Sequence, residues 1–196
     1  MTPAKIVAAY IQNRRRCARS EADEFQRLAS IEVAIEHAAL CHFLPDCKRH
    51  PHQRRIPGAL LKPAERKLQG IRSKLTRAKT FDEVHALVDE AIGNIRGIGE
   101  LTIYDIAHRI GAFLDKEPTR VYLHAGTRAG ARLMGFTGTS LDPTQLPPAF
   151  SRLTAAEIED CLCIYREDLR EHRSCARPLQ RANHCASPSQ RSKRPC

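Results

Sequence analysis

Residues 95–111 read IRGIGELTIYDIAHRIG, and this stretch decides how the chain is expected to fold. Gly97 and Gly99 bracket a single isoleucine, Ile98. Apolar residues recur at helical spacing before the glycines: Phe81, Val84, Val88, Ala91 and Ile95. A second helical stripe follows them: Ile103, Ile106, Ala107, Ile110 and Leu114. The pattern predicts two amphipathic helices joined by a tight Gly-Ile-Gly turn.

The residue types in this turn suit an anion site. Glycine permits backbone angles that place consecutive N–H groups on one side of a turn. Ile98 is expected to fill the gap between the helices. The free N–H groups of Gly97, Gly99, Leu101 and Thr102 would then bind a phosphate of the DNA backbone at the start of the second helix. The alternative is a helix hairpin that uses glycine only to end its first helix.

Capping signals extend the helical prediction on both sides of the hairpin. Thr2-Pro3 predicts a helix to about Cys17, and a second helix is expected from about Ser20 to about Phe43. A loop follows over residues 44–57, and a third helix is expected from about Pro63. Thr80 with Glu83 and Thr154 with Glu157 form capping boxes.

The remaining segments complete an all-α prediction. Residues 121–135 are read as a short helix closed by Gly135, and residues 136–150 as a loop. No alternating strand pattern is apparent. We expect one domain over residues 1–172, a helical bundle containing a helix-hairpin-helix motif. Residues 173–196 are rich in Arg, Ser, Pro, Cys and Gln, and are expected to form a disordered basic tail.

Charge and composition narrow the function classes. The 196-residue chain has a net charge of +10 and a pI of about 9.5. This balance favours a polyanionic partner, with nucleic acid first and an anionic membrane surface second. A solvated basic surface is the alternative. Aromatic residues make up 5% of the chain and Trp is absent, which disfavours a flat base-stacking platform.

Cysteine usage and hydropathy predict a cytoplasmic protein. The eight cysteines form no regular framework, so reduced thiols are expected. No apolar run approaches membrane-spanning length and no signal-peptide core is apparent, so no membrane association is predicted.

The loop segment CHFLPDCKRHPHQRRIP, residues 41–57, admits three readings. Its possible zinc ligands are Cys41, Cys47, His50 and His52, but their spacing matches no standard finger, so no metal or other cofactor is predicted. A second reading is an anion-binding loop that adds His50, His52, Arg54 and Arg55 to the DNA contacts. The third is an exposed basic loop without a ligand.

Two groups of polar residues are candidates for chemistry. Tyr104 and His108 are four residues apart on the second hairpin helix, as are Asp105 and Arg109. A surface ion pair beside a half-buried tyrosine is one reading, and an acid or base in a cleft is the other. A second group follows the hairpin: Tyr122, His124 and Arg128.

The hairpin resembles that of the helix-hairpin-helix DNA glycosylase superfamily. The resemblance extends into PTRVYLHAGTRAGARLMG and covers roughly residues 80–135. In that superfamily a segment of the type Val-Asp-x-His-x-x-Arg follows the hairpin, and this chain has Val121, Tyr122, Leu123, His124 and then Arg128. The resemblance implies the fold of the hairpin and binding to the DNA backbone.

Two departures separate this chain from glycosylase chemistry. Leu101 stands where bifunctional members carry a nucleophilic lysine, and Tyr122 stands where the superfamily has an aspartate. We therefore predict a protein that binds duplex DNA through its phosphates, without glycosylase activity. The alternative is an enzyme that modifies nucleic-acid bases or nucleotides with altered catalytic residues, the candidates being Asp105, Tyr122, His124 and Arg128.

Overall fold

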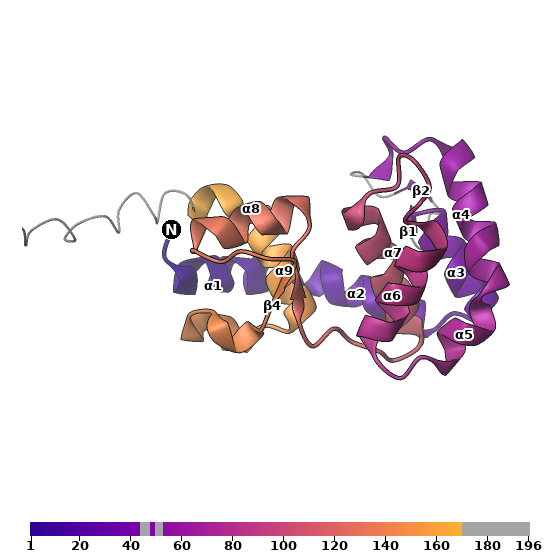
Figure 1. Ribbon diagram of the computed structural model, residues 1–196. Coiled ribbons are helices and arrows are strands. Elements are labelled where there is room, and N and C mark those ends of the chain that lie inside the picture. Colours follow the sequence, from indigo (N-terminus) through magenta and orange to yellow (C-terminus); the bar gives the residue numbers. More distant parts are fainter. Residues whose placement is uncertain (44–47, 50–52, 170–196) are drawn as a thin grey trace, which may run out of the picture.

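A computed structural model describes residues 1–43, 48–49 and 53–169 of the chain (Figure 1). These residues are predominantly helical, which confirms the predicted class. Their buried side chains form two separate hydrophobic clusters, each at the centre of one lobe. Residues 170–196, including the predicted tail, lie outside the described residues.

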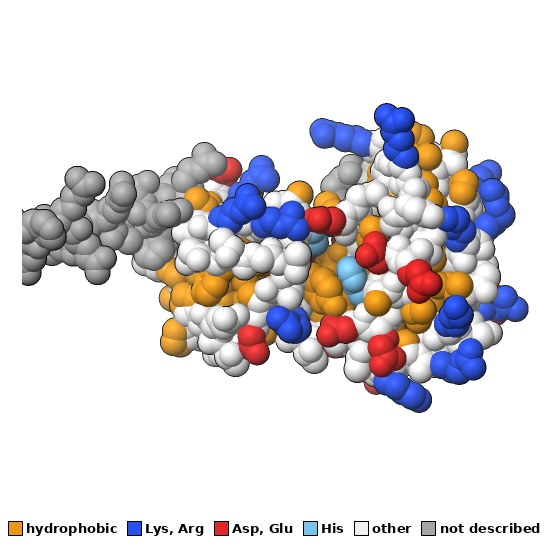
Figure 2. Space-filling view, in the orientation of Figure 1, with side chains coloured by type: hydrophobic (Ala, Val, Ile, Leu, Met, Phe, Trp, Pro, Cys, Tyr) orange, Lys and Arg blue, Asp and Glu red, His pale blue; other side chains and the backbone are white. Residues whose placement is uncertain are grey.

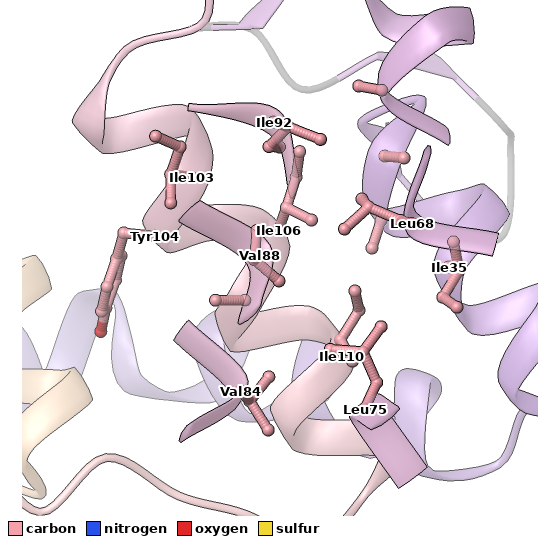
Figure 3. Close-up of a cluster of buried hydrophobic side chains, with 14 of the residues drawn as sticks. Ile35, Leu68, Leu75, Val84, Val88, Ile92, Ile103, Tyr104, Ile106 and Ile110 are labelled. Carbon is pink, nitrogen blue, oxygen red and sulfur yellow. The ribbon is translucent and has the colours of Figure 1, made fainter. Parts of the chain in front are cut away.

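The larger lobe lies on the right of Figure 1. Its helices are α2 (Arg15–Gln26), α3 (Ile31–Ala39), α4 (Gly58–Gly70), α5 (Arg72–Arg77), α6 (Phe81–Ile92) and α7 (Glu100–Phe113). The short strands β1 (His42–Phe43) and β2 (Lys48–Arg49) pair antiparallel beside them. Figure 3 shows the apolar faces of α3 to α7 meeting in one core, with Ile35, Leu68, Val88 and Ile106 among its members.

The smaller lobe combines the start of the chain with its later part. It contains α1 (Pro3–Asn13), β3 (Val121–Tyr122), α8 (Ala125–Leu133), β4 (Ser140–Leu141), the 3-10 helices η2 (Pro143–Gln145) and η3 (Pro148–Arg152), and α9 (Ala155–Ile164). Ile6, Val7 and Tyr10 of α1 pack in one core with Phe150 and Leu162. The chain thus starts in the smaller lobe with α1, forms the larger lobe from α2 to α7, and ends in the smaller lobe from β3 to α9 (Figure 1).

Helix α2 contacts both lobes and links them. Phe25, near its end, is buried in the core of the larger lobe. Near its start, Arg15 and Arg19 form ion pairs of 2.8 and 2.9 Å with Glu157 of the smaller lobe. Glu157 is only 5% exposed and also completes the capping box of Thr154. A buried carboxylate held by two guanidinium groups favours one fixed arrangement of the lobes.

Strand β3 also contributes side chains to the cores of both lobes, because successive side chains of a strand point to opposite faces. Val121 and Leu123 are buried in the smaller core, whereas Tyr122 between them packs against the larger one. The antiparallel partner β4 sets this register by pairing Val121 with Leu141 and Tyr122 with Ser140.

Several predicted boundaries were wrong at the start of the chain. The first helix ends at Asn13 rather than near Cys17, and Ser20 lies inside α2. The expected helix from Ser20 to Phe43 is two helices, because Ser30 adopts an extended backbone and its side chain accepts a hydrogen bond from the Val33 N–H. Ser30 is therefore the N-cap of a new helix, and the preceding helix ends before it.

Other boundaries also moved. Helix α4 begins at Gly58, so Pro63 lies inside it rather than at its start. The expected loop over residues 136–150 contains β4, η2 and the beginning of η3. The two strand pairs, each of two residues per strand, were not predicted, since such short pairs show no alternation. The capping box of Thr154 with Glu157 is confirmed, whereas Thr80 accepts from the Glu83 N–H but the Glu83 side chain accepts from the Lys79 N–H, so the second box is incomplete. The helix expected over residues 121–135 begins only at Ala125, because Val121 and Tyr122 form β3, and it ends before Gly135, whose φ of +92° is left-handed.

Candidate functional site at the junction of the two lobes

The glycine turn joins α6 to α7 and owes its shape to Gly97. Gly97 has φ +101°, in the left-handed region that favours glycine, and a Cβ there would lie 2.8 Å from Cδ1 of Leu60 in α4. Gly99 has an extended backbone (φ −110°, ψ 174°), which any residue can adopt. Ile98 is 7% exposed and packs in the larger core, where it fills the space beneath the turn.

The N-terminus of α7 opens from this turn without a side-chain cap. Gly99 is its N-cap residue and has no side chain that could accept a hydrogen bond from the first turn. Such a helix start carries partial positive charge and free N–H groups. Leu101 is half-buried and Thr102 is 6% exposed, so a ligand at the turn would meet their backbone rather than their side chains.

Basic groups from three elements surround the turn. Arg96 within the turn is exposed. Lys67 of α4 donates a hydrogen bond of 2.9 Å to the Asn94 side chain. Arg128 of α8 comes from the other lobe and pairs with Glu100 in the first turn of α7 at 2.7 Å. The start of α7 therefore faces the smaller lobe. The Glu100 carboxylate lies beside the free N–H groups of this helix start.

Tyr104 connects the hairpin helix to the lobe junction. Its ring is 3% exposed, rather than half-buried as one reading of the sequence had it. In Figure 3 it points away from the isoleucine and leucine side chains of the core. Its ring stacks on His108 (5.7 Å between centroids) and contacts Tyr122 (5.6 Å) and His124 (5.2 Å).

Tyr122 and its neighbours complete an aromatic cluster. Its ring lies 4.6 Å from that of His85 and 5.4 Å from that of Phe81. Its hydroxyl donates a 2.7 Å hydrogen bond to Asp82. Burial, together with that bond and the Asp82 charge, raises the pKa of Tyr122 well above its ordinary value. Burial lowers the pKa of His85, against the opposing effects of Asp89 and Asp82.

His124 is the most deeply buried of the predicted candidates. It is the N-cap residue of α8 and is 3% exposed. Its Nε2 lies 2.8 Å from Oε1 of Glu159 in α9, without the alignment of a hydrogen bond, and the Thr127 hydroxyl donates to the same oxygen. Its Nδ1 has no hydrogen-bond partner among the described residues. A buried imidazole beside a carboxylate can hold or move a proton.

Asp105 belongs to a second polar group on α7. The side chain of Gln53, which is 1% exposed, donates to Asp105 at 2.8 Å and accepts from Arg109 at 3.0 Å. Arg109 is buried and pairs with Glu21 of α2 at 2.8 Å, so the predicted surface pair of Asp105 with Arg109 was wrong. Burial opposes its charge, but Asp105 and Glu21 outweigh that effect and raise the pKa of Arg109.

The predicted residues thus divide among several partners. Tyr122 binds Asp82, His124 lies on Glu159, Arg128 pairs with Glu100, and Asp105 is held by Gln53. The rings of Tyr122 and His124 both contact the ring of Tyr104, whereas Arg128 lies beside Glu100 at the start of α7. Arg54 and Arg55 are exposed beside Gln53. Cys47, His50 and His52 lie outside the described residues.

Sequence reasoning missed the carboxylates that α9 brings to the junction. Glu159 is 9% exposed although it stands in an ordinary amphipathic helix. Burial and the neighbouring Glu159 raise the pKa of Asp160 to about 6. The only sequence signal for these buried carboxylates was that Glu159 and Asp160 lie next to the apolar stripe of Ile158 and Leu162. The same pattern is usual on helix faces that are exposed to solvent, so it does not predict burial.

Over residues 1–43, 48–49 and 53–169, no group of three or more His, Cys, Asp or Glu side chains is arranged to hold a metal ion. Within those same ranges, no helix has the length and apolar character that crossing a membrane requires.

Comparison with known proteins yields no relative: no family model, curated protein or solved structure matches this chain.

Proposed function

We propose that this protein binds duplex DNA through the phosphate backbone, with the α6–α7 hairpin as the principal contact. The observation that carries the proposal is the uncapped N-terminus of α7 behind a left-handed glycine turn. Backbone N–H groups at such a helix start suit a phosphate oxygen. Exposed Arg96 and Lys67 border the turn, and the whole chain has a charge of +10. Contacts of this type position a protein on DNA without reading its sequence.

The test is a binding titration of the full chain with duplex DNA, single-stranded DNA and duplex RNA at several salt concentrations. We expect duplex DNA to bind best and its affinity to fall steeply with salt, because each phosphate contact releases counterions. Affinity that is unchanged between low and physiological salt, or absence of binding, would contradict the proposal.

A second candidate function is an enzyme acting on nucleic-acid bases or nucleotides. Buried His124 favours it, because its Nε2 lies beside Glu159, its ring contacts Tyr104 and its Nδ1 has no hydrogen-bond partner among the described residues. The test is mass analysis of nucleosides from DNA and RNA incubated with the protein. A new nucleoside made by the parent and not by His124→Gln, with DNA binding equal in both, would identify catalysis. Unchanged nucleosides would contradict the enzymatic function, and DNA binding would be the function that stays proposed.

A further inference from the structure

The exposed side of α4 and α5 is strongly basic. Residues 58–79 contain seven Lys or Arg residues and one acidic residue, Glu65. All seven basic residues are exposed: Lys62, Arg66, Lys67, Arg72, Lys74, Arg77 and Lys79. Figure 2 shows Lys and Arg side chains over the edge of the larger lobe where Figure 1 places these helices.

The packing of α4 explains why its charges point outward. Leu61, Ala64 and Leu68 are buried in the protein, and their helical spacing leaves Lys62 and Arg66 on the opposite side. Arg72 differs from the rest, because it forms a 3.2 Å ion pair with Glu32 across a shallow hollow between α3 and α5. The other basic residues have no acidic partner among the described residues.

Charge is segregated within the larger lobe. Helix α6 carries the opposite sign, with Asp82, Glu83, Asp89 and Glu90 all exposed. A surface whose charge only maintains solubility gains nothing from such separation, whereas a one-signed face attracts a polyanion. The basic face also joins the hairpin directly, because Lys67 bonds to Asn94 and Leu60 lies against Gly97.

From this continuity we propose that the DNA backbone runs from the hairpin along the exposed side of α4 toward α5, with Lys62, Arg66 and Lys74 as phosphate contacts. The inference rests on the proposed function and extends it to a second part of the surface. Helix α4 has 13 residues. At about 1.5 Å per residue it is roughly 20 Å long, comparable to about six base pairs of duplex.

The experiment compares two triple variants of equal charge. Lys62→Gln/Arg66→Gln/Lys74→Gln removes the proposed contacts, and none of these side chains has an ion-pair or hydrogen-bond partner within the part of the chain that the structure describes. Lys5→Gln/Arg16→Gln/Arg152→Gln removes the same charge from exposed positions in α1, η3 and the first turn of α2, away from α4. Circular dichroism and thermal melting establish that both variants fold as the parent does. Affinity for a duplex of about 20 base pairs, which exceeds the length of α4, is then measured against salt.

The basic-face variant should weaken binding by roughly tenfold and reduce the slope of log affinity against log salt by about 2 to 3, since each lost phosphate contact removes about 0.9. The control variant should keep the slope of the parent. Equal changes in the two variants, or a basic-face variant that binds as the parent does, would overturn the inference. Duplex RNA competing better than duplex DNA would also overturn it.

A hairpin variant separates this inference from the proposed function. If Gly99→Ala loses affinity while the basic-face variant keeps the parent slope, the hairpin contact stands and the inference fails. If the basic-face variant loses affinity while Gly99→Ala binds normally, the phosphate contacts on α4 and α5 stand, but the hairpin contact and a DNA path that starts there are refuted. A parent chain that binds no DNA refutes both.

Discussion

The two hairpin glycines have different roles. Gly97 is left-handed and its Cβ position is occupied by Leu60, whereas Gly99 has an extended backbone with no atom within 4 Å of an added Cβ. Gly97→Ala should therefore destabilise the fold by roughly 1–2 kcal/mol. This corresponds to a melting temperature lower by about 2–8 °C. Gly99→Ala should melt like the parent.

Gly99→Ala should nevertheless weaken DNA binding, because the added methyl group stands where a phosphate must approach the first N–H groups of α7. Gln12→Ala is the control, since Gln12 is exposed on α1 in the smaller lobe, away from both the hairpin and α4. Affinities measured side by side decide the matter. If both alanine variants bind as the parent does, the hairpin is only a structural turn.

Glu100 should act against DNA binding. Its carboxylate lies in the first turn of α7 and engages Arg128, so it places negative charge near the proposed phosphate and occupies a basic side chain. Glu100→Gln should bind duplex DNA roughly two- to fivefold tighter at low salt, in keeping with an exposed ion pair, and the gain should vanish at high salt. Glu36→Gln, on the exposed side of α3, should change nothing. Weaker binding by Glu100→Gln would show that the pair supports the site.

The chain should not excise damaged bases. Leu101 has no nucleophile, and the Tyr122 phenol is held neutral on Asp82, so it cannot stabilise positive charge as a carboxylate would. We expect no strand cleavage of duplexes carrying common damaged bases, and no covalent adduct after borohydride reduction. Robust nicking by purified protein would refute this.

At the scale of elements, the packing of α9 against the other helices creates a pH-dependent term. Burial, with Glu159 and Asp105 nearby, raises the pKa of Asp160 from 3.8 to about 6, against the effects of Tyr10 and Arg14. A raised carboxyl pKa means that the folded state retains a proton which the unfolded chain has lost. Stability should therefore fall as pH rises from about 4 to 6 and level off above that.

Asp160→Asn tests this expectation. The variant should be more stable than the parent at pH 7 by up to about 3 kcal/mol, and the difference should disappear near pH 4. Chemical denaturation of both proteins over this range supplies the measurement, and subtracting the two curves removes the contribution of other groups. A constant difference across the range would show that the carboxyl titrates normally.

The elements that were predictable are those with local signals. Thr80 and Thr154 cap helices through residues three positions away, and the sequence displays both partners at once. The helices α6 and α7 were predictable because each shows a local apolar periodicity on its own side of the glycines. The site was less accessible, because Gln53 reaches Asp105 across 52 positions and Thr127 reaches Glu159 across 32. Such pairs depend on how helices pack, which periodicity does not encode.

At the scale of the whole molecule, the basic C-terminal segment should serve binding rather than folding. The described core ends with Leu169, which is 1% exposed. Deleting residues 174–196 removes no described core side chain, so the melting temperature should stay nearly unchanged. The segment is rich in Arg, so its loss should weaken non-specific DNA binding and flatten the salt dependence. A large drop in melting temperature would mean that it packs against the lobes.

The division of the smaller lobe has a consequence for synthesis on the ribosome. The larger lobe is continuous in sequence from α2 to α7, but α1 must find partners as distant as α9. About 150 residues separate Asn13 from Ile164, so at roughly 5–20 residues per second α1 waits about 8–30 s for its core to be made. During that time Ile6, Val7 and Tyr10 lack the surfaces that later bury them. A nascent chain halted once residue 118 has left the exit tunnel should accordingly present a folded larger lobe and an α1 available to chaperones, which crosslinking on stalled ribosomes can detect.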